Sequence, residues 1–197
     1  VEFSYNNDFL VSAEKVNGTS ILFDYDDDNL MTNAGDLVLT YSPVNGLLTK
    51  TALGAIDTDY TYNSFGELDS VTTQNFVTSM TRDKIGRIKT KSETIQGATT
   101  NYEYVYDQDG RLKQVLKDGL IHRVETYDDN GNRTLTTVGV DATIKAYDNQ
   151  DRLISAGSVN YQYNRNGDLT LKTDTATSEA TIYDTDIFGN LKQVDLP

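Results

Sequence analysis

His122 is the single histidine of this 197-residue chain, and it is the first residue to consider for catalysis. A Ser–His–Asp site needs an imidazole within hydrogen-bond reach of a hydroxyl nucleophile and of an orienting carboxylate. Ser and Asp are plentiful, but no segment resembles a nucleophile elbow. We therefore interpret His122 as a strand residue near the Asp118-Gly119 turn, and we expect no catalytic residue.

The spacing Asp24-x-Asp26-x-Asp28 resembles the start of a calcium-binding loop built from oxygen ligands. An EF-hand also requires Gly at its sixth position and Glu at its twelfth, where this chain has Asn29 and Gly35. We interpret these aspartates as turn residues and keep a weak cation site as the alternative. Asp107-x-Asp109-Gly110 is interpreted in the same way, and no metal or cofactor is expected.

Thirteen tyrosines stand beside thirty acidic residues, a combination that suits carbohydrate, because sugars stack on aromatic rings and bond to carboxylates. The alternative is that the tyrosines line the wall of a sheet, where each hydroxyl finds a polar partner. The regular placement of the tyrosines favours this wall, and a glycan-binding surface is kept as the second interpretation.

Composition and charge limit the partners. The 17 basic and 30 acidic residues give a net charge of −13, which works against nucleic acids and against anionic membrane surfaces. No apolar run reaches the roughly 20 residues that a membrane-spanning helix needs. Cysteine is absent, so no disulfide framework and no thiolate metal site can form. Position 1 is Val and no signal segment follows, so we expect a piece of a longer polypeptide.

An internal repeat runs through the whole chain. The clearest copy is Tyr104-Val-Tyr106-Asp107-Gln-Asp-Gly110-Arg-Leu112, and close relatives begin at Tyr60 and Tyr161. With the glycine slot as anchor, ten copies fall at positions 9, 29, 46, 66, 86, 110, 131, 151, 167 and 189. A period near 20 residues predicts a single array over residues 1–197, without a linker or a second domain.

Each repeat position has a physical reason. Asp or Asn stands three residues before the glycine slot in nine copies, Pro43 being the exception, and this spacing predicts a type I turn with a G1 bulge. Phe9 is the misfit among residues in the slot. The residue before the Asx is Tyr in seven copies, and the residue two after the slot is apolar in nine, Arg133 being the exception. These two residues should form a cross-strand pair on one face, as Tyr106 with Leu112 and Tyr163 with Leu169.

The repeat residues that we expect to matter are structural rather than catalytic. They are Tyr62, Asn63, Gly66, Leu68, Asp83, Gly86, Ile88, Tyr104, Tyr106, Asp107, Gly110, Leu112, Tyr127, Asp128, Gly131, Tyr147, Asp148, Leu153, Tyr161, Tyr163, Asn164, Gly167, Leu169, Asp186, Gly189 and Leu191.

The remaining seven glycines lie between the slots and indicate a second turn in every unit, as at Asn17-Gly18. Each unit is then strand, tight turn, strand and looser turn, and no segment has helical periodicity. The predicted fold class is all-β: about ten tandem antiparallel hairpins of about 20 residues, with about 4.8 Å per strand. So many strands should curl into a spiral or partial barrel, and the two edges invite self-association.

The motif Tyr-x-Tyr-Asp-x-x-Gly-Arg-Leu at this interval resembles the YD repeat, also called the RHS repeat. Tyr104 to Leu112 matches it in full, whereas the copies ending at Leu68 and Leu169 carry Asn for Asp and an acidic residue for Arg. The resemblance implies a segment of a hollow β-shell, as in bacterial polymorphic Rhs toxins, insecticidal toxin complexes and teneurin adhesion receptors. No Asp-Pro-x-Gly-Leu self-cleavage element is present, so neither autoproteolysis nor toxin activity is carried over.

The leading hypothesis is therefore a structural, non-enzymatic shell segment of a large secreted or cell-surface bacterial protein, whose shell encloses a C-terminal domain. Its partner would be the rest of its own polypeptide. The alternative is a carbohydrate- or cell-surface-binding module that uses the tyrosine face. Choline-binding repeats of similar period depend on Trp, which this chain lacks.

Overall fold

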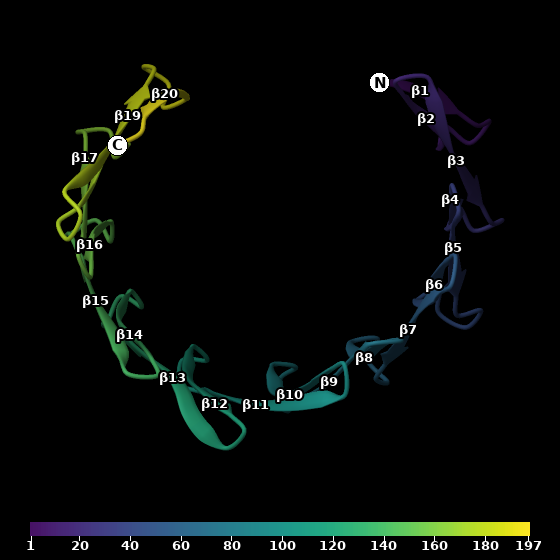
Figure 1. The fold of residues 1–197 in the computed structure, drawn as a ribbon, viewed down its shortest axis with the longest axis horizontal. Coiled ribbons are helices and arrows are strands. Elements are labelled where there is room, and N and C mark those ends of the chain that lie inside the picture. The colour runs from purple at the N-terminus through teal and green to yellow at the C-terminus, as the bar shows by residue number, and fades with distance from the viewer. The chain divides into compact units, whose positions relative to one another are not determined.

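The computed structural model describes all residues, 1–197, and consists of twenty β-strands without a helix (Figure 1). The predicted all-β class of tandem antiparallel hairpins is confirmed. The strands are β1 (Glu2–Tyr5), β2 (Val11–Val16), β3 (Thr19–Tyr25), β4 (Met31–Ala34), β5 (Leu37–Tyr41), β6 (Leu48–Leu53), β7 (Ile56–Tyr62), β8 (Leu68–Thr73), β9 (Phe76–Arg82), β10 (Ile88–Ile95), β11 (Ala98–Tyr106), β12 (Leu112–Lys117), β13 (Leu120–Tyr127), β14 (Arg133–Val138), β15 (Asp141–Tyr147), β16 (Leu153–Ala156), β17 (Val159–Tyr163), β18 (Leu169–Asp174), β19 (Glu179–Thr185) and β20 (Leu191–Asp195). No helix is present that is long and apolar enough to cross a membrane.

The chain divides into two compact units, residues 1–103 and 104–197, and the boundary falls within β11. In unit 1 each strand pairs antiparallel with the next, from β1–β2 through β10–β11. In unit 2 the same meander runs from β12–β13 to β19–β20. Each unit is thus a ladder of neighbouring hairpins in which contacts are local in sequence.

The register of the hairpins matches the expected cross-strand pairs. Tyr62 lies opposite Leu68, and Tyr163 lies opposite Leu169. The register of β7 and β8 shifts by one residue next to this pair. Thr61 pairs with Ser70, which leaves Asp69 as the extra residue of a bulge. Tyr62 and Leu68 share a face as a directly opposed pair, and the bulge beyond them brings Val71 opposite Tyr60.

The second turns differ in part from the prediction. Seven of them contain glycine, with both central residues at positive φ in Asn17-Gly18, as a type I′ turn requires. However, glycine is absent from the turn at Gln74-Asn75 and from the longer turn at Thr175–Ser178, where Ser178 takes the left-handed conformation at φ 64°. The expectation of a glycine in every second turn was therefore wrong.

Few side chains are buried. Val115 is the single hydrophobic residue classed as buried, and Thr78 and Glu125 are the buried polar ones. In strands such as β5, β7 and β17 the tyrosine face is half-buried and the opposite face is exposed, as in β5, where Leu37, Leu39 and Tyr41 alternate with exposed neighbours. Because a single layer has no second layer to pack on, its stability rests on strand pairing and on contacts between neighbouring repeats.

Candidate functional site: the turn and tyrosine contacts between repeats

The Asx turn of each repeat closes through its backbone. At residues 63–67, the Gly66 N–H donates to the Asn63 carbonyl over 3.0 Å, and the Asn63 N–H donates to the Glu67 carbonyl over 2.9 Å. Gly66 has φ 79°, the left-handed conformation that the spacing predicts. Phe9, Asn29 and Asp151 hold the slot in their own repeats at φ 62°, 64° and 60°. The slot therefore demands this conformation even where glycine is missing.

The Asx side chain caps the same turn. Its Oδ1 accepts the N–H two residues on and the N–H four residues on, as Asn63 does from Phe65 at 2.9 Å and from Glu67 at 3.0 Å. The second bond recurs from Leu10 to Asn6, Leu30 to Asp26, Arg87 to Asp83, Arg111 to Asp107, Asn132 to Asp128, Arg152 to Asp148, Asp168 to Asn164 and Asn190 to Asp186. One side-chain oxygen thus orders the whole turn.

The other Asx polar atom pairs with the side chain that follows the glycine slot. Asp107 Oδ2 accepts from Arg111 Nε at 2.7 Å, and Asp148 Oδ2 accepts from Arg152 Nε at 2.7 Å. Where the Asx is an asparagine the polarity is reversed, because Asn63 Nδ2 donates to Glu67 Oε2 at 2.7 Å. Asn164 donates to Asp168 in the same way, so the departures of these copies from the motif compensate each other.

These bonds shift the acidity of the turn carboxyls. The side-chain hydrogen bond from Arg152 lowers the pKa of Asp148 below its usual value, and the bond from Asn190 does so for Asp186. At Asp107 partial burial raises the pKa, but the bonds from Arg111 outweigh burial and the pKa is lowered. The charged form of each carboxyl is therefore the form that the turn stabilises.

The tyrosine before each Asx joins its repeat to the preceding one. Its hydroxyl donates to the backbone carbonyl of the first residue in the preceding repeat's second strand, over 2.7–3.1 Å. These bonds run from Tyr25 to Val11, Tyr41 to Met31, Tyr62 to Leu48, Tyr127 to Leu112, Tyr147 to Arg133 and Tyr163 to Leu153. The half-buried phenol thus satisfies a carbonyl of the neighbouring hairpin.

The arginine after the glycine slot also reaches the next repeat. The Arg111 guanidinium lies 4.7 Å from the ring centre of Tyr127, and its Nη1 donates to the Asp128 carbonyl at 3.4 Å. Arg152 lies 5.0 Å from the ring centre of Tyr163. Tyr127 and Tyr163 are therefore each held by a hydroxyl hydrogen bond and by a cation–π contact.

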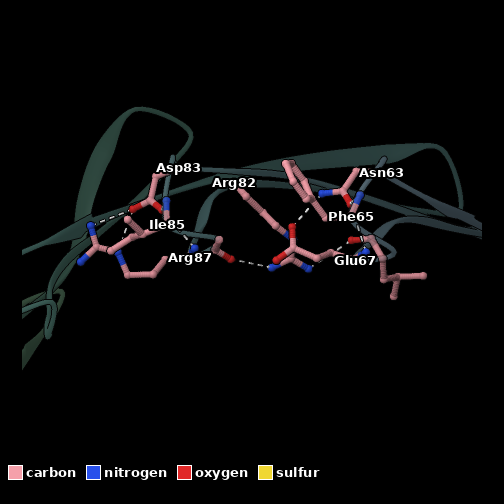
Figure 2. A network of polar contacts seen from close by, with 9 residues as sticks. Asn63, Phe65, Glu67, Arg82, Asp83, Ile85 and Arg87 are labelled. Carbon is pink, nitrogen blue, oxygen red and sulfur yellow. Dashed lines mark hydrogen bonds and ion pairs between the residues drawn. The ribbon is translucent and has the colours of Figure 1, made fainter.

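Arg82 replaces tyrosine in the fifth repeat (Figure 2). Its Nη2 donates to the Leu68 carbonyl at 3.2 Å, the bond that a tyrosine hydroxyl makes elsewhere. The residue that faces it from the preceding turn is Glu67 instead of arginine, with Oε2 3.5 Å from Arg82 Nε. The exchange of tyrosine for arginine is thus matched by an exchange of arginine for glutamate.

The other residues considered for chemistry lie apart from one another. His122 is exposed on β13, and its carbonyl accepts from the Gly139 N–H at 2.9 Å. Asp26 Oδ1 accepts from Asp28 and Leu30 in the turn, and Asp109 pairs with Arg111 Nη2 at 2.8 Å. No group of three or more histidine or acidic side chains is arranged to hold a metal ion.

Three features of the contacts were missed from the sequence. Tyr41 occupies the tyrosine position, because Ser42 takes the Asx place and the Gly46 N–H reaches the Ser42 carbonyl across a turn one residue longer. Assignment of Pro43 to the Asx place was therefore wrong, and eight repeats carry the tyrosine. The pairing of Glu67 with Arg82 was also missed, although opposite departures from the motif in consecutive copies were its signal. The third missed feature is the pairing of Glu125 with Arg123, which lies two residues before it on β13.

Comparison with known proteins agrees with this geometry. The family model described as the teneurin YD-shell matches residues 71–196, more than half of the chain, and the chain belongs to that family. The resemblance to YD repeats is confirmed. Human teneurin-4 is 29% identical over 184 residues, which cover 85% of this chain and 6% of that protein. Mouse teneurin-3 is 28% identical over 186 residues, covering 85% and 7%.

Among solved structures, the Photorhabdus luminescens Tc holotoxin pore aligns with 93% of this chain and 16% of its own chain, at a TM-score of 0.50 and 14% identity. Identity this low supports a shared fold alone. The chain spans only 6–7% of the length of the curated relatives named above.

Proposed function

We propose that residues 1–197 form one uninterrupted array, a wall segment of a hollow YD-repeat shell that continues in further repeats of a longer polypeptide. Family membership and the small share of its relatives that the chain covers support this proposal. β1 pairs with β2 and β20 with β19, so strands of adjoining repeats would extend the ladder at the outer edges. Without them, these edges would favour self-association.

The observation that carries the proposal is the recurring bond between a tyrosine hydroxyl and a carbonyl of the preceding repeat. Each such bond uses a polar side chain to join two hairpins. Arg111 joins its hairpin to the next one through the Asp128 carbonyl, and Asp107 pairs with Arg111 inside its own turn. The role is containment rather than catalysis, because the recurring geometry of the repeat uses its own polar groups to connect the strands of a wall.

The enclosed partner would be a C-terminal domain of the same polypeptide, in a bacterial protein that is secreted or exposed on the cell surface. The resemblance to Rhs toxins supports a bacterial source, whereas the teneurins named above are vertebrate proteins. The extracellular setting is inferred from the resemblance to secreted and cell-surface proteins of the YD-repeat type.

Limited proteolysis of the longer polypeptide tests containment. The C-terminal domain should resist trypsin in the intact protein and become sensitive when Tyr127→Ala and Tyr147→Ala remove two contacts between repeats. His122→Ala is the control, because this exposed side chain makes no such contact. Degradation of the C-terminal domain at the same rate in all three proteins would contradict containment.

Carbohydrate binding is the second candidate. A second set of tyrosines, including Tyr60 and Tyr161, lies two residues before the tyrosines that bond to the preceding repeat. These side chains are half-buried and donate no hydroxyl hydrogen bond within the protein. Their rings and hydroxyls are available to a sugar, unlike those of Tyr62 and Tyr163. Titration with a glycan panel tests it: saturable binding that Tyr161→Ala abolishes would support a lectin-like role, and no saturable binding would exclude these sugars.

A further inference from the structure

A cluster of charged side chains surrounds one buried carboxylate in unit 2. Glu125 on β13 is 2% exposed. Its Oε1 accepts a hydrogen bond from Arg123 Nε, its Oε2 lies 3.3 Å from Arg133 Nε, and the Thr136 hydroxyl donates to Oε2 at 2.7 Å. Arg123 is therefore hydrogen-bonded to Glu125 through Nε, whereas Arg133 Nε is buried beside Oε2 at ion-pair distance and makes no hydrogen bond.

Strand register brings a third cation to the same place. Glu125 lies opposite Thr136, and Thr136 lies opposite Thr143 on β15. Lys145, two residues beyond Thr143, is on the same face, and its Nζ donates to Thr136 Oγ1 at 2.8 Å. Three cations thus share one carboxylate, and the lysine contacts a neutral hydroxyl.

This imbalance sets the cluster apart from other charged pairs of the chain. Arg111 and Arg152 each have the carboxylate of their own turn, and Lys50 has Asp57. At Lys145, burial and the nearby positive charge of Arg133 lower the pKa in spite of the attraction of Glu125. The cluster carries two uncompensated positive charges within a chain whose net charge is −13.

The donors of the cluster are accessible. The side chains of Arg123 and Arg133 are 37% and 41% exposed. Neither arginine makes a hydrogen bond through Nη within the protein, and each approaches Glu125 through Nε. An arginine held at Nε presents its two Nη groups as a planar fork that matches an oxyanion.

We propose that Arg123, Arg133 and Lys145 form a binding site for a small oxyanion, a phosphate or carboxylate group with two or more acceptor oxygens. Glu125 is a positioning residue, which pairs with both guanidinium groups on their Nε side, so that their Nη donors stay unbonded within the protein. The anion has two sources, a free ion or a carboxylate on an acidic segment of polypeptide. This site is independent of the proposed shell function, since it depends on side chains within β13–β15 alone.

Titration of the ¹⁵N-labelled chain tests the site with two probes, inorganic phosphate and a tetraglutamate peptide, at constant ionic strength. We expect saturable shifts of the arginine Nε–Hε signals and of the amides of β13–β15. Saturation by phosphate alone indicates a free ion, and tighter saturation by the peptide indicates a polypeptide carboxylate. Both support the site, whereas no saturation by either probe up to about 20 mM overturns it.

Variants separate this site from general charge attraction. Arg133→Gln and Lys145→Gln should each weaken binding by roughly tenfold, the loss of one charge-assisted hydrogen bond. Lys145→Gln leaves the pairing of both arginines with Glu125 in place, so a weaker binding by this variant reports the loss of the lysine itself. Lys192→Gln, which removes an exposed cation paired with Asp184 in the same unit, is the matched control and should bind as the unmodified chain. Equal weakening in the control and in Lys145→Gln would overturn the proposal.

Discussion

At the scale of single residues, the Asx side chain has two tasks in the turns where a polar residue follows the glycine slot. Its Oδ1 fixes the backbone, and its second polar atom holds the residue after the glycine slot. The choice between Asp and Asn then follows from that residue, because Asp107 faces an arginine and Asn63 faces a glutamate. Asp and Asn are therefore not interchangeable here, although both can cap a turn.

The glycine slot yields the first prediction. Gly110 has φ 82°, where a β-branched side chain clashes with the backbone. Gly110→Val should lower the free energy of unfolding by more than about 1 kcal/mol in urea titration. Gly110→Asn is the control and should cost clearly less, because Asn29 takes the same slot at φ 64°. Equal losses of stability in the two variants would contradict the claim that the positive φ of the slot penalises valine more than asparagine.

The turn carboxyls yield a prediction on pH. The hydrogen bond from Arg152 lowers the pKa of Asp148 in the folded chain, so the unfolded chain binds this proton more readily. Its contribution to stability is complete above the unfolded pKa and is lost as the pH falls through the folded value.

Urea titrations from about pH 6 to pH 2 measure this dependence. Asp148→Asn should be less stable than the unmodified chain near neutral pH, and the difference should shrink in acid. A difference that stays constant over this range would contradict the role of the ionised carboxyl.

At this scale the sequence predicted most of the local geometry. The Asx turns, the left-handed slot and the cross-strand tyrosine–leucine pairs follow from the spacing of four residue types. The turn at Ser42 was missed because its loop is one residue longer, which breaks the spacing. Its backbone hydrogen bonds still place Tyr41 where its hydroxyl bonds to the Met31 carbonyl of the preceding repeat.

At the scale of the hairpin, the tyrosine hydroxyl links elements that the turn alone leaves separate. Tyr127 donates to the Leu112 carbonyl at 2.7 Å, and Tyr161 has no such partner. Tyr127→Phe should therefore lower the free energy of unfolding by about 1 kcal/mol, the usual worth of one hydrogen bond. Tyr161→Phe should change it by less than about 0.5 kcal/mol in the same urea titration. Equal destabilisation by Tyr127→Phe and Tyr161→Phe would contradict the role of the Tyr127 hydroxyl bond.

The exchange at Glu67 and Arg82 yields a second prediction at this scale (Figure 2). Glu67→Arg places two cations together, and Arg82→Tyr leaves the glutamate without its cation. The double variant restores the arginine–tyrosine contact seen between Arg111 and Tyr127. Each single variant should be destabilised, and the double variant should be more stable than their sum by about 1 kcal/mol.

A double-mutant cycle measures this coupling. Loss of the Asn63–Glu67 bond is common to both proteins with Glu67→Arg and cancels in the cycle. A coupling below about 0.3 kcal/mol would mean that the two exchanges are independent.

Contacts between hairpins were less accessible from the sequence than the hairpins themselves. A period locates the strands, but it does not show which side chain of one repeat meets the next. Glu125 illustrates the difficulty, because Arg133 pairs with it from β14 and Lys145 on β15 reaches it only through Thr136, an arrangement set by strand register.

At the scale of the whole molecule, each unit is one layer with few buried side chains. Large apolar residues at turn tips remain open to solvent, such as Val44 at 90% and Phe65 at 87% exposure. A domain built this way gains stability from its neighbours in the array rather than from a core. The sequence predicted tandem hairpins without a core-forming helix, but it did not predict the division into residues 1–103 and 104–197.

Cryo-electron microscopy of the longer polypeptide is the most direct test of the central claim. We predict that residues 1–197 lie in the wall of a closed shell. Each Asx turn should end at its glycine slot, and each tyrosine before an Asx should contact the preceding hairpin. A map that shows this segment outside any enclosure, or with its hairpins separated from one another, would contradict it.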